Sequence, residues 1–239
     1  MEERRGFLKK LGIAFMGVES LIFPSSAAPM IVESDSRRPP IDRMKVAFVI
    51  FNGITALDFV GFYDPIMRLK SQGYIPNLSW DICSFTDTVQ DNFGLSLMPT
   101  KVRQSLDSYD MVFVPGGLGT RPLQNNRDFI NWLKTAQNVP QKVSVCTGSL
   151  LLGAAGFLKD KKATTNFKEY DTLKQYCPDV LKVKIVEDRD VITAGAVASS
   201  LDLGLYVCEK LAGPEAREAI RVNMDYPKIE VTTKKVVNE

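Results

Sequence analysis

Short runs of apolar, β-favouring residues alternate with helix-like segments along most of the chain. The run KVAFVIF at residues 45–51 is almost wholly apolar, which is typical of a strand buried on both faces. The runs MVFV at 111–114 and KVSV at 142–145 are similar, and each leads into a turn and a helix-like stretch. Because strands that alternate with helices pair in parallel, the sequence predicts an α/β fold with a mostly parallel sheet between two layers of helices.

The segments between these runs carry helix and turn signals. Within residues 56–72, four branched apolar side chains lie at roughly helical spacing: Leu57, Val60, Ile66 and Leu69. We expect further helices at residues 127–137, 149–158, 168–176 and 197–213, and another that begins at 213 with Pro214 in its first turn. An Asn-Phe-Gly turn predicts a small hairpin within 88–100, and residues 181–195 indicate two strands around a turn at 187–190.

Composition limits the chemistry that the chain can perform. It has 239 residues, 45% of them hydrophobic, which suits one domain with a sizeable core. It has no histidine, which excludes a Ser-His or Cys-His catalytic pair within the chain and a histidine-ligated metal. Its four cysteines are far apart and form no Cys-x-x-Cys motif, so we expect no metal site. The net charge is +2, and no basic block follows the first ten residues, which gives little support to a nucleic-acid partner.

The N-terminal segment has the pattern of an export signal. The sequence RRGFLKK, with Arg4 and Arg5, precedes a moderately apolar stretch and the small-residue sequence PSSAAP. This order predicts a twin-arginine-type signal peptide at residues 1–27, a linker at 28–43 and a periplasmic destination. The apolar stretch is short and contains Glu19, so we expect no stable membrane span. The alternative is an ordinary amphipathic N-terminal helix.

Five residues lie where a parallel sheet of this kind binds ligands, beyond the carboxyl ends of its strands. Asp58 follows the first strand, Gly116 and Gly117 follow the MVFV strand, and Cys146 and Thr147 follow the KVSV strand. We expect these residues to form one site. Taken alone, Asp58 could instead cap a helix, and the two glycines could form a plain turn.

Cys146 stands at the point where a strand turns into a helix. The N–H groups of the following helix would stabilise a thiolate there, so the position predicts a lowered thiol pKa and a reactive nucleophile. The backbone N–H groups of Gly117 and Thr147 could stabilise negative charge on a bound substrate. Asp58 lies in the apolar sequence TALDFVG, where burial would raise its pKa and make it a proton donor or acceptor. The alternative is that Cys146 is a small buried residue that fills a tight turn.

Five motifs across residues 44–226 resemble the ThiJ/PfpI superfamily, whose fold is similar to that of class I glutamine amidotransferases. They are ITALDFVG, VFVPGG, SVCTGSLLLGAAGFL, ATTNF and DVITAGAVASSLDLGL. The resemblance implies a flavodoxin-like three-layer sandwich with a nucleophile elbow, a domain at 44–227 followed by a C-terminal tail at 228–239, and a homodimer. The Cys-Thr-Gly sequence and the aspartate after the first strand are similar to the isonitrile hydratase branch, and also to the sensor domain of AraC-type regulators.

The resemblance implies roles for three of the site residues. Cys146 corresponds to the nucleophile, Asp58 to its acid/base partner and Thr147 to a residue that lines the site. The implied reaction is hydration of an isonitrile to an N-substituted formamide, which needs no metal or organic cofactor. The chain departs from the branch at Asn166 and Phe167, where ATTHW is usual, and at Phe62, where a proline is usual.

Several other functions fit parts of the pattern. A glyoxalase- or deglycase-like enzyme needs little more than the same cysteine and carboxylate. A redox sensor or a small-ligand binding protein needs no turnover at all. A peptidase of the superfamily would have a histidine directly after the cysteine, where this chain has Thr147. A transcriptional regulator would need a DNA-binding domain, which we do not expect in the short segment after Tyr226.

Overall fold

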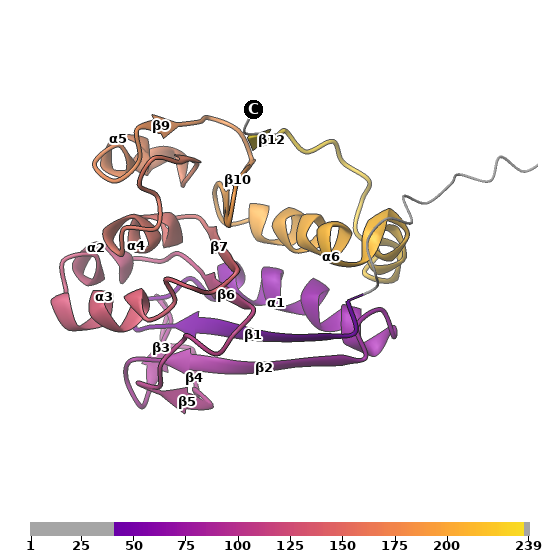
Figure 1. Cartoon of the computed structure of the whole chain (residues 1–239), viewed down its shortest axis with the longest axis horizontal. Helices are drawn as coiled ribbons and strands as arrows, with labels where there is room; N and C mark the ends of the chain where they lie inside the picture. Colours follow the sequence, from indigo (N-terminus) through magenta and orange to yellow (C-terminus); the bar gives the residue numbers. More distant parts are fainter. Residues whose placement is uncertain (1–40, 237–239) are drawn as a thin grey trace, which may run out of the picture. The chain divides into compact units, whose positions relative to one another are not determined.

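The computed structural model describes residues 41–236 (Figure 1), so the predicted signal peptide at 1–27 and most of the linker lie outside the described residues. Within the described part, the main sheet has the strand order β12-β10-β11-β7-β6-β1-β2-β5. Its strands are β1 (Arg43–Ile50), β2 (Asn77–Ser84), β5 (Lys101–Val102), β6 (Met111–Val114), β7 (Gln141–Val145), β10 (Ile185–Asp188), β11 (Val191–Ala194) and β12 (Thr233–Val236). Neighbouring strands pair in parallel except β10 and β11, which are antiparallel. The predicted, mostly parallel sheet is confirmed.

The helices cover both faces of this sheet. They are α1 (Ala56–Ser71), α2 (Thr120–Leu123), α3 (Arg127–Lys134), α4 (Gly148–Ala154), the short 3-10 helix η1 (Phe167–Glu169), α5 (Tyr170–Leu173) and α6 (Ser199–Asn223). Helices α1 and α6 pack side by side (Figure 1). Phe62 of α1 stacks on Phe113 of β6, with ring centroids 4.0 Å apart. This contact places α1 on the face to which Phe113 points.

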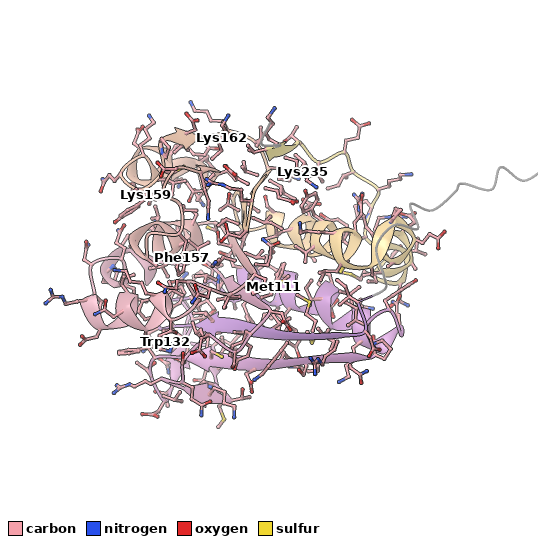
Figure 2. The ribbon with its side chains drawn as sticks, viewed as in Figure 1. Met111, Trp132, Phe157, Lys159, Lys162 and Lys235 are labelled. Atoms are coloured by element: carbon pink, nitrogen blue, oxygen red, sulfur yellow. The ribbon has the colours of Figure 1, made fainter. Side chains whose placement is uncertain are left out.

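The opposite face is marked by Lys142 of β7. Phe113 is in register with Val143, and successive strand residues point to opposite faces, so Lys142 points away from α1. Its Nζ donates to the carbonyl of Gln137, which follows α3, and lies 5.4 Å from the ring centroid of Phe157, which follows α4 (labelled in Figure 2). The sheet therefore lies between two helical layers, as expected of the three-layer sandwich.

Helix α1 buries a different stripe from the one that the sequence suggested. Its buried apolar side chains are Phe59, Phe62, Ile66 and Leu69. These positions follow the spacing of 3, 4 and 3 residues that keeps side chains on one helical face. Leu57 and Val60 lie off this face and are 48% and 44% exposed. Grouping them with Ile66 and Leu69 was therefore wrong, because aromatic residues occupy the positions that face the sheet.

The smaller elements largely follow the sequence. The expected hairpin is present as β3 (Val89–Gln90) and β4 (Ser96–Leu97), which pair antiparallel. A second small sheet joins β8 (Lys162–Ala163) to β9 (Asp179–Val180) in parallel. Helix α6 contains a break at Gly213, whose φ is +88°, so two helical segments meet there, as Pro214 indicated. The segment after residue 227, which we expected to form a tail, includes β12 beside β10.

Candidate active site

Cys146 occupies a strained elbow between β7 and α4. Its φ is +55°, in the left-handed region that costs a non-glycine residue about 1–3 kcal/mol. The Cys146 N–H donates to the carbonyl oxygens of Ala194 and Gly195, at 3.0 and 2.7 Å, which anchors the elbow to the end of β11. The residue is 5% exposed. A turn that needed only a small residue would favour glycine at this φ, so the strain points to a role for the side chain.

Gly116 is the point where the expected site residues meet. A Cβ at this position would lie 2.6 Å from the Thr147 nitrogen and 2.8 Å from both Asp58 Oδ2 and Cys146 Cβ. Real Cβ atoms do not approach other atoms so closely, so only glycine fits here. The structure therefore brings Asp58, Gly116, Cys146 and Thr147 together, at the carboxyl ends of the neighbouring strands β1, β6 and β7.

Asp58 is held by a neighbouring strand end. It lies in the first turn of α1, but the N-cap residue is Thr55, and no side-chain hydrogen bond caps this helix. The Asp58 side chain is fully buried, and its Oδ2 accepts the Gly116 N–H at 2.9 Å. The other oxygen, Oδ1, has no hydrogen-bond partner among the described residues. A buried carboxyl group with a free oxygen is unlike a helix cap and suits an acid/base group.

The expected effect of burial on Asp58 is confirmed. Burial raises its pKa from 3.8 to about 6, and this effect outweighs the lowering effects of the Gly116 N–H and of the neighbouring Cys146 thiol. The thiol lies close enough to act on the carboxyl group but does not form a well-aligned hydrogen bond with it. At neutral pH the carboxyl group is therefore mostly ionised, and it can accept a proton.

The prediction of a lowered Cys146 pKa is wrong. Burial and the charge of Asp58 raise the pKa of the thiol to about 11, against smaller lowering effects of the Asn166 amide and the Thr147 N–H. Helix α4 has only 7 residues, and it begins two positions after the cysteine. The Thr147 N–H, which precedes this helix, lowers the thiol pKa by less than the loss of water around the sulfur raises it. The proton therefore rests on sulfur at neutral pH, beside an ionised carboxylate.

Gly117 and Thr147 are hydrogen-bonded to each other, so their backbone N–H groups do not form a pair of donors open to a substrate. The Gly117 N–H donates to Thr147 Oγ1 at 3.0 Å, and the same hydroxyl donates to the Gly117 carbonyl oxygen at 3.2 Å. The expectation that the Gly117 N–H faces a substrate anion is therefore wrong for this conformation, because Thr147 already accepts it. The Thr147 N–H acts on the Cys146 sulfur, where it lowers the pKa of the thiol.

Two residues that the sequence did not assign to the site also contact Cys146. Asn166 Nδ2 donates to Cys146 Sγ at 3.3 Å, and Thr165 Oγ1 donates to the Cys146 carbonyl oxygen at 2.9 Å. Both belong to the ATTNF motif, in which Asn166 stood out as a departure from the branch. These two residues could not be assigned to the site from their position after a strand of the main sheet, because they lie in the turn between β8 and η1.

The described residues 41–236 contain no group of three or more Asp, Glu or Cys side chains arranged to bind a metal ion. No helix among them is both long and apolar enough to span a membrane. The groups that the site brings together are a thiol, a buried carboxylate and two N–H donors, from Asn166 and Thr147, at the sulfur.

Comparisons with known proteins agree with this architecture. The model of the DJ-1/PfpI family matches residues 44–210. An isonitrile hydratase of Pseudomonas putida is 30% identical over 185 residues, which are 77% of this chain and 78% of that protein. The transcriptional regulator CdhR of Pseudomonas aeruginosa is 23% identical over 201 residues, 78% of this chain and 59% of the regulator.

Two solved structures show the same fold. A ThiJ/PfpI family protein from Pseudomonas syringae superposes with a TM-score of 0.73 at 26% identity, and the match covers 87% of this chain and 85% of that one. Drosophila melanogaster DJ-1beta superposes with a TM-score of 0.67 at 17% identity, covering 78% of this chain and all of the other. The family model spans well over half of the residues, so the chain belongs to the DJ-1/PfpI family.

Proposed function

We propose that the chain is a cysteine-dependent enzyme that hydrates isonitriles to N-substituted formamides. The observation that carries this proposal is the pairing of the Cys146 thiol with the buried carboxylate of Asp58, which the Gly116 N–H holds in place. A nucleophile and a base in contact are what covalent catalysis requires. The similarity to the isonitrile hydratase of Pseudomonas putida supports the choice of substrate.

The first half of the reaction forms a covalent adduct. The Asp58 carboxylate accepts the thiol proton as Cys146 Sγ bonds to the terminal carbon of R–N≡C. Asp58 then returns this proton to the same carbon. The product is a thioimidate, R–N=CH–S–Cys146, in which sulfur and hydrogen have added to one carbon. Asp58 is again ionised, and no external oxidant or reductant is consumed.

The second half releases the formamide. Water adds to the thioimidate carbon while Asp58 accepts one of its protons, and Asp58 passes this proton to the nitrogen of the adduct. The C–S bond then breaks as the new hydroxyl becomes a carbonyl, and Asp58 carries the hydroxyl proton to the leaving sulfur, which gives R–NH–CHO and restores the Cys146 thiol. Oδ1 of Asp58 has no partner among the described residues, so it can hold the attacking water.

A substrate comparison tests this function. Purified protein without residues 1–27 is incubated with an alkyl isonitrile or with a small 1,2-dicarbonyl, and the products are followed by NMR. Steady formation of formamide supports the proposal. Turnover of the dicarbonyl alone would favour the glyoxalase- or deglycase-like alternative, and binding without turnover of either compound would favour a sensor or binding protein.

We also propose export of the folded protein to the periplasm. The support is the sequence RRGFLKK in the segment outside the described residues. Replacing Arg4 and Arg5 by lysine keeps the charge but removes the arginine pair, and should leave the precursor in the cytoplasm. Cell fractionation and immunoblotting measure this. Periplasmic recovery of the lysine variant at the normal level would exclude the twin-arginine route.

A homodimer is the assembly that we propose, and α1 offers a surface for it. Leu57 and Val60 are 48% and 44% exposed on this helix, and burying them between two copies would remove apolar surface from water. Light scattering at micromolar concentration should give the mass of a dimer. Leu57→Glu should shift it toward the monomer, because the interface would then bury an unpaired charge.

Val222→Glu provides the control for this experiment. Val222 is a 60% exposed apolar residue near the C-terminal end of α6, so the substitution adds the same charge to a different surface. Light scattering of Val222→Glu should give the same mass as that of the parent protein. A monomeric parent, or equal effects of the two substitutions, would rule out a dimer formed through α1.

A further inference from the structure

Asn166 places an amide group on the sulfur of Cys146. Its Nδ2 donates to Sγ at 3.3 Å. Asn166 is half-buried and precedes η1, so its side chain reaches the elbow from a segment separate from the strand ends that carry Asp58 and Gly116. The proposed steps of isonitrile hydration use the sulfur and the carboxylate and do not involve this amide.

The orientation of the amide is fixed by its second contact. Asn166 is the N-cap residue of η1, and its Oδ1 accepts the Lys168 N–H at 3.0 Å. Rotating the amide by half a turn would place the NH₂ group against this N–H, so two donors would face each other. The cap therefore requires that the NH₂ group faces the sulfur, where it can donate a hydrogen bond but cannot accept one.

The turn that carries Asn166 is held on both sides. Before it, Thr165 Oγ1 donates to the Cys146 carbonyl oxygen at 2.9 Å. After it, Glu169 accepts from Arg121 at 2.6 Å, and Arg121 also donates to the Gly117 carbonyl oxygen at 3.1 Å. These contacts tie the turn to the cysteine elbow and to the glycine turn, so the amide meets the sulfur in a fixed geometry.

The contacts of the sulfur divide into two kinds. Asn166 Nδ2 and the Thr147 N–H act on it as donors, and both favour negative charge on sulfur. Asp58 is the charged neighbour, and it has the opposite effect. In the proposed reaction Asp58 accepts the thiol proton, and the donors act on the sulfur that this transfer leaves charged.

We propose that Asn166 is a further catalytic residue, whose amide N–H stabilises the negative charge that develops on Cys146 Sγ. This charge appears when Asp58 removes the thiol proton, and again when the C–S bond breaks and sulfur leaves. The inference rests on the proposed role of Cys146 as nucleophile. It extends that role by giving the thiolate a neutral donor that does not titrate and therefore acts at every pH.

Two substitutions separate this role from the helix cap. Asn166→Ser retains a capping oxygen, since serine is a strong N-cap residue, but its side chain is too short to reach the sulfur. Asn166→Asp also retains a capping oxygen and replaces the donor with a second carboxylate. The readout is the rate of alkylation of Cys146 by iodoacetamide against pH, resolved by mass spectrometry for each cysteine.

Loss of one hydrogen bond to a charged atom should raise the apparent Cys146 pKa by about one unit in Asn166→Ser. The alkylation rate below that pKa should fall only about three- to tenfold, because a more basic thiolate is also a better nucleophile. Asn166→Asp should raise the apparent pKa further, since it adds a like charge beside the thiolate. The ratio of the Cys146 alkylation rates in the two variants shows whether the group at position 166 stabilises or destabilises the thiolate.

Cys83, Cys177 and Cys208 are internal controls, because they do not contact Asn166 and should react as in the parent protein. A Cys146 profile in Asn166→Ser that superimposes on that of the parent would overturn the proposal. So would Asn166→Asp reacting as fast as the parent. Either variant alone decides the matter if the other fails to fold. Isonitrile is not used, so an inactive parent would count against the proposed substrate and leave this test intact.

Discussion

Replacing Asp58 with asparagine should slow isonitrile turnover by about 10²–10⁴-fold, the usual loss for an acid/base group. Asparagine has nearly the same shape, and its side-chain oxygen can still accept the Gly116 N–H that Asp58 accepts at 2.9 Å. It cannot take the thiol proton from Cys146 or return it to the substrate carbon. The loss should therefore appear mainly in kcat, with little change in substrate binding.

The same substitution should stabilise the folded protein at neutral pH. The folded-state pKa of Asp58 is raised from 3.8 to about 6, so between about pH 4 and 6 the folded protein holds a proton that the unfolded chain has released. The stability that neutral Asp58 contributes is fully present below about pH 4 and is lost as pH rises through 6. Asparagine removes this pH-dependent loss, which is on the order of 1–3 kcal/mol for a buried carboxylate shifted by this amount.

Turnover should increase over the pH range in which folding stability decreases. Ionised Asp58 is the base that the mechanism needs, so kcat/KM should rise as pH increases through about 6. This rise should be absent in Asp58→Asn. Urea unfolding and pH–rate profiles measure both effects on the same preparations.

Asp64→Asn is the matched control for Asp58→Asn. Asp64 lies on the same helix, but its side chain is 49% exposed and pairs with Arg68. Its replacement should change neither turnover nor stability by much, because exposed ion pairs contribute little. If Asp58→Asn destabilised the protein and left turnover intact, Asp58 would be a structural residue.

The meeting of Asp58, Gly116 and Cys146 could be predicted from the sequence. Each follows an apolar, strand-like run, and the carboxyl ends of parallel strands lie at one edge of a sheet. The structure adds the order of the strands: β1, β6 and β7 are neighbours, which brings the three residues into contact. The sheet itself was predictable because strands buried on both faces are apolar throughout.

The chemistry of the sulfur could not be predicted in the same way. The position of Cys146 before a helix indicated a lowered thiol pKa. Burial, together with the charge of Asp58, instead raises this pKa to about 11. Burial could not be predicted, because it depends on residues brought together from the whole chain. Asn166 was also missed as a contact, since it reaches Cys146 from a turn beyond β8. The exposure of Leu57 and Val60 depends on which side of α1 meets the sheet, and helical spacing alone left that open.

Replacing Cys146 with alanine or glycine should abolish turnover, by on the order of 10⁴-fold or more, because the covalent route is lost. The two variants should differ in stability, however. The φ of Cys146 is +55°. Glycine adopts this angle without strain, whereas the Cβ of alanine makes it unfavourable. Cys146→Gly should therefore be at least as stable as Cys146→Ala, whereas at ordinary positions alanine is the more stable of the two by about 0.4–1 kcal/mol.

This comparison distinguishes a nucleophile from a residue that fills a turn. If the turn alone mattered, glycine would be the better residue at 146, whereas a nucleophile must keep its side chain at a cost in stability. Formamide production by Cys146→Ala at more than about one hundredth of the parent rate would mean that water attacks the isonitrile without the thiol. Asp58 would then be the remaining catalytic group, and its asparagine variant would be the one to lose activity.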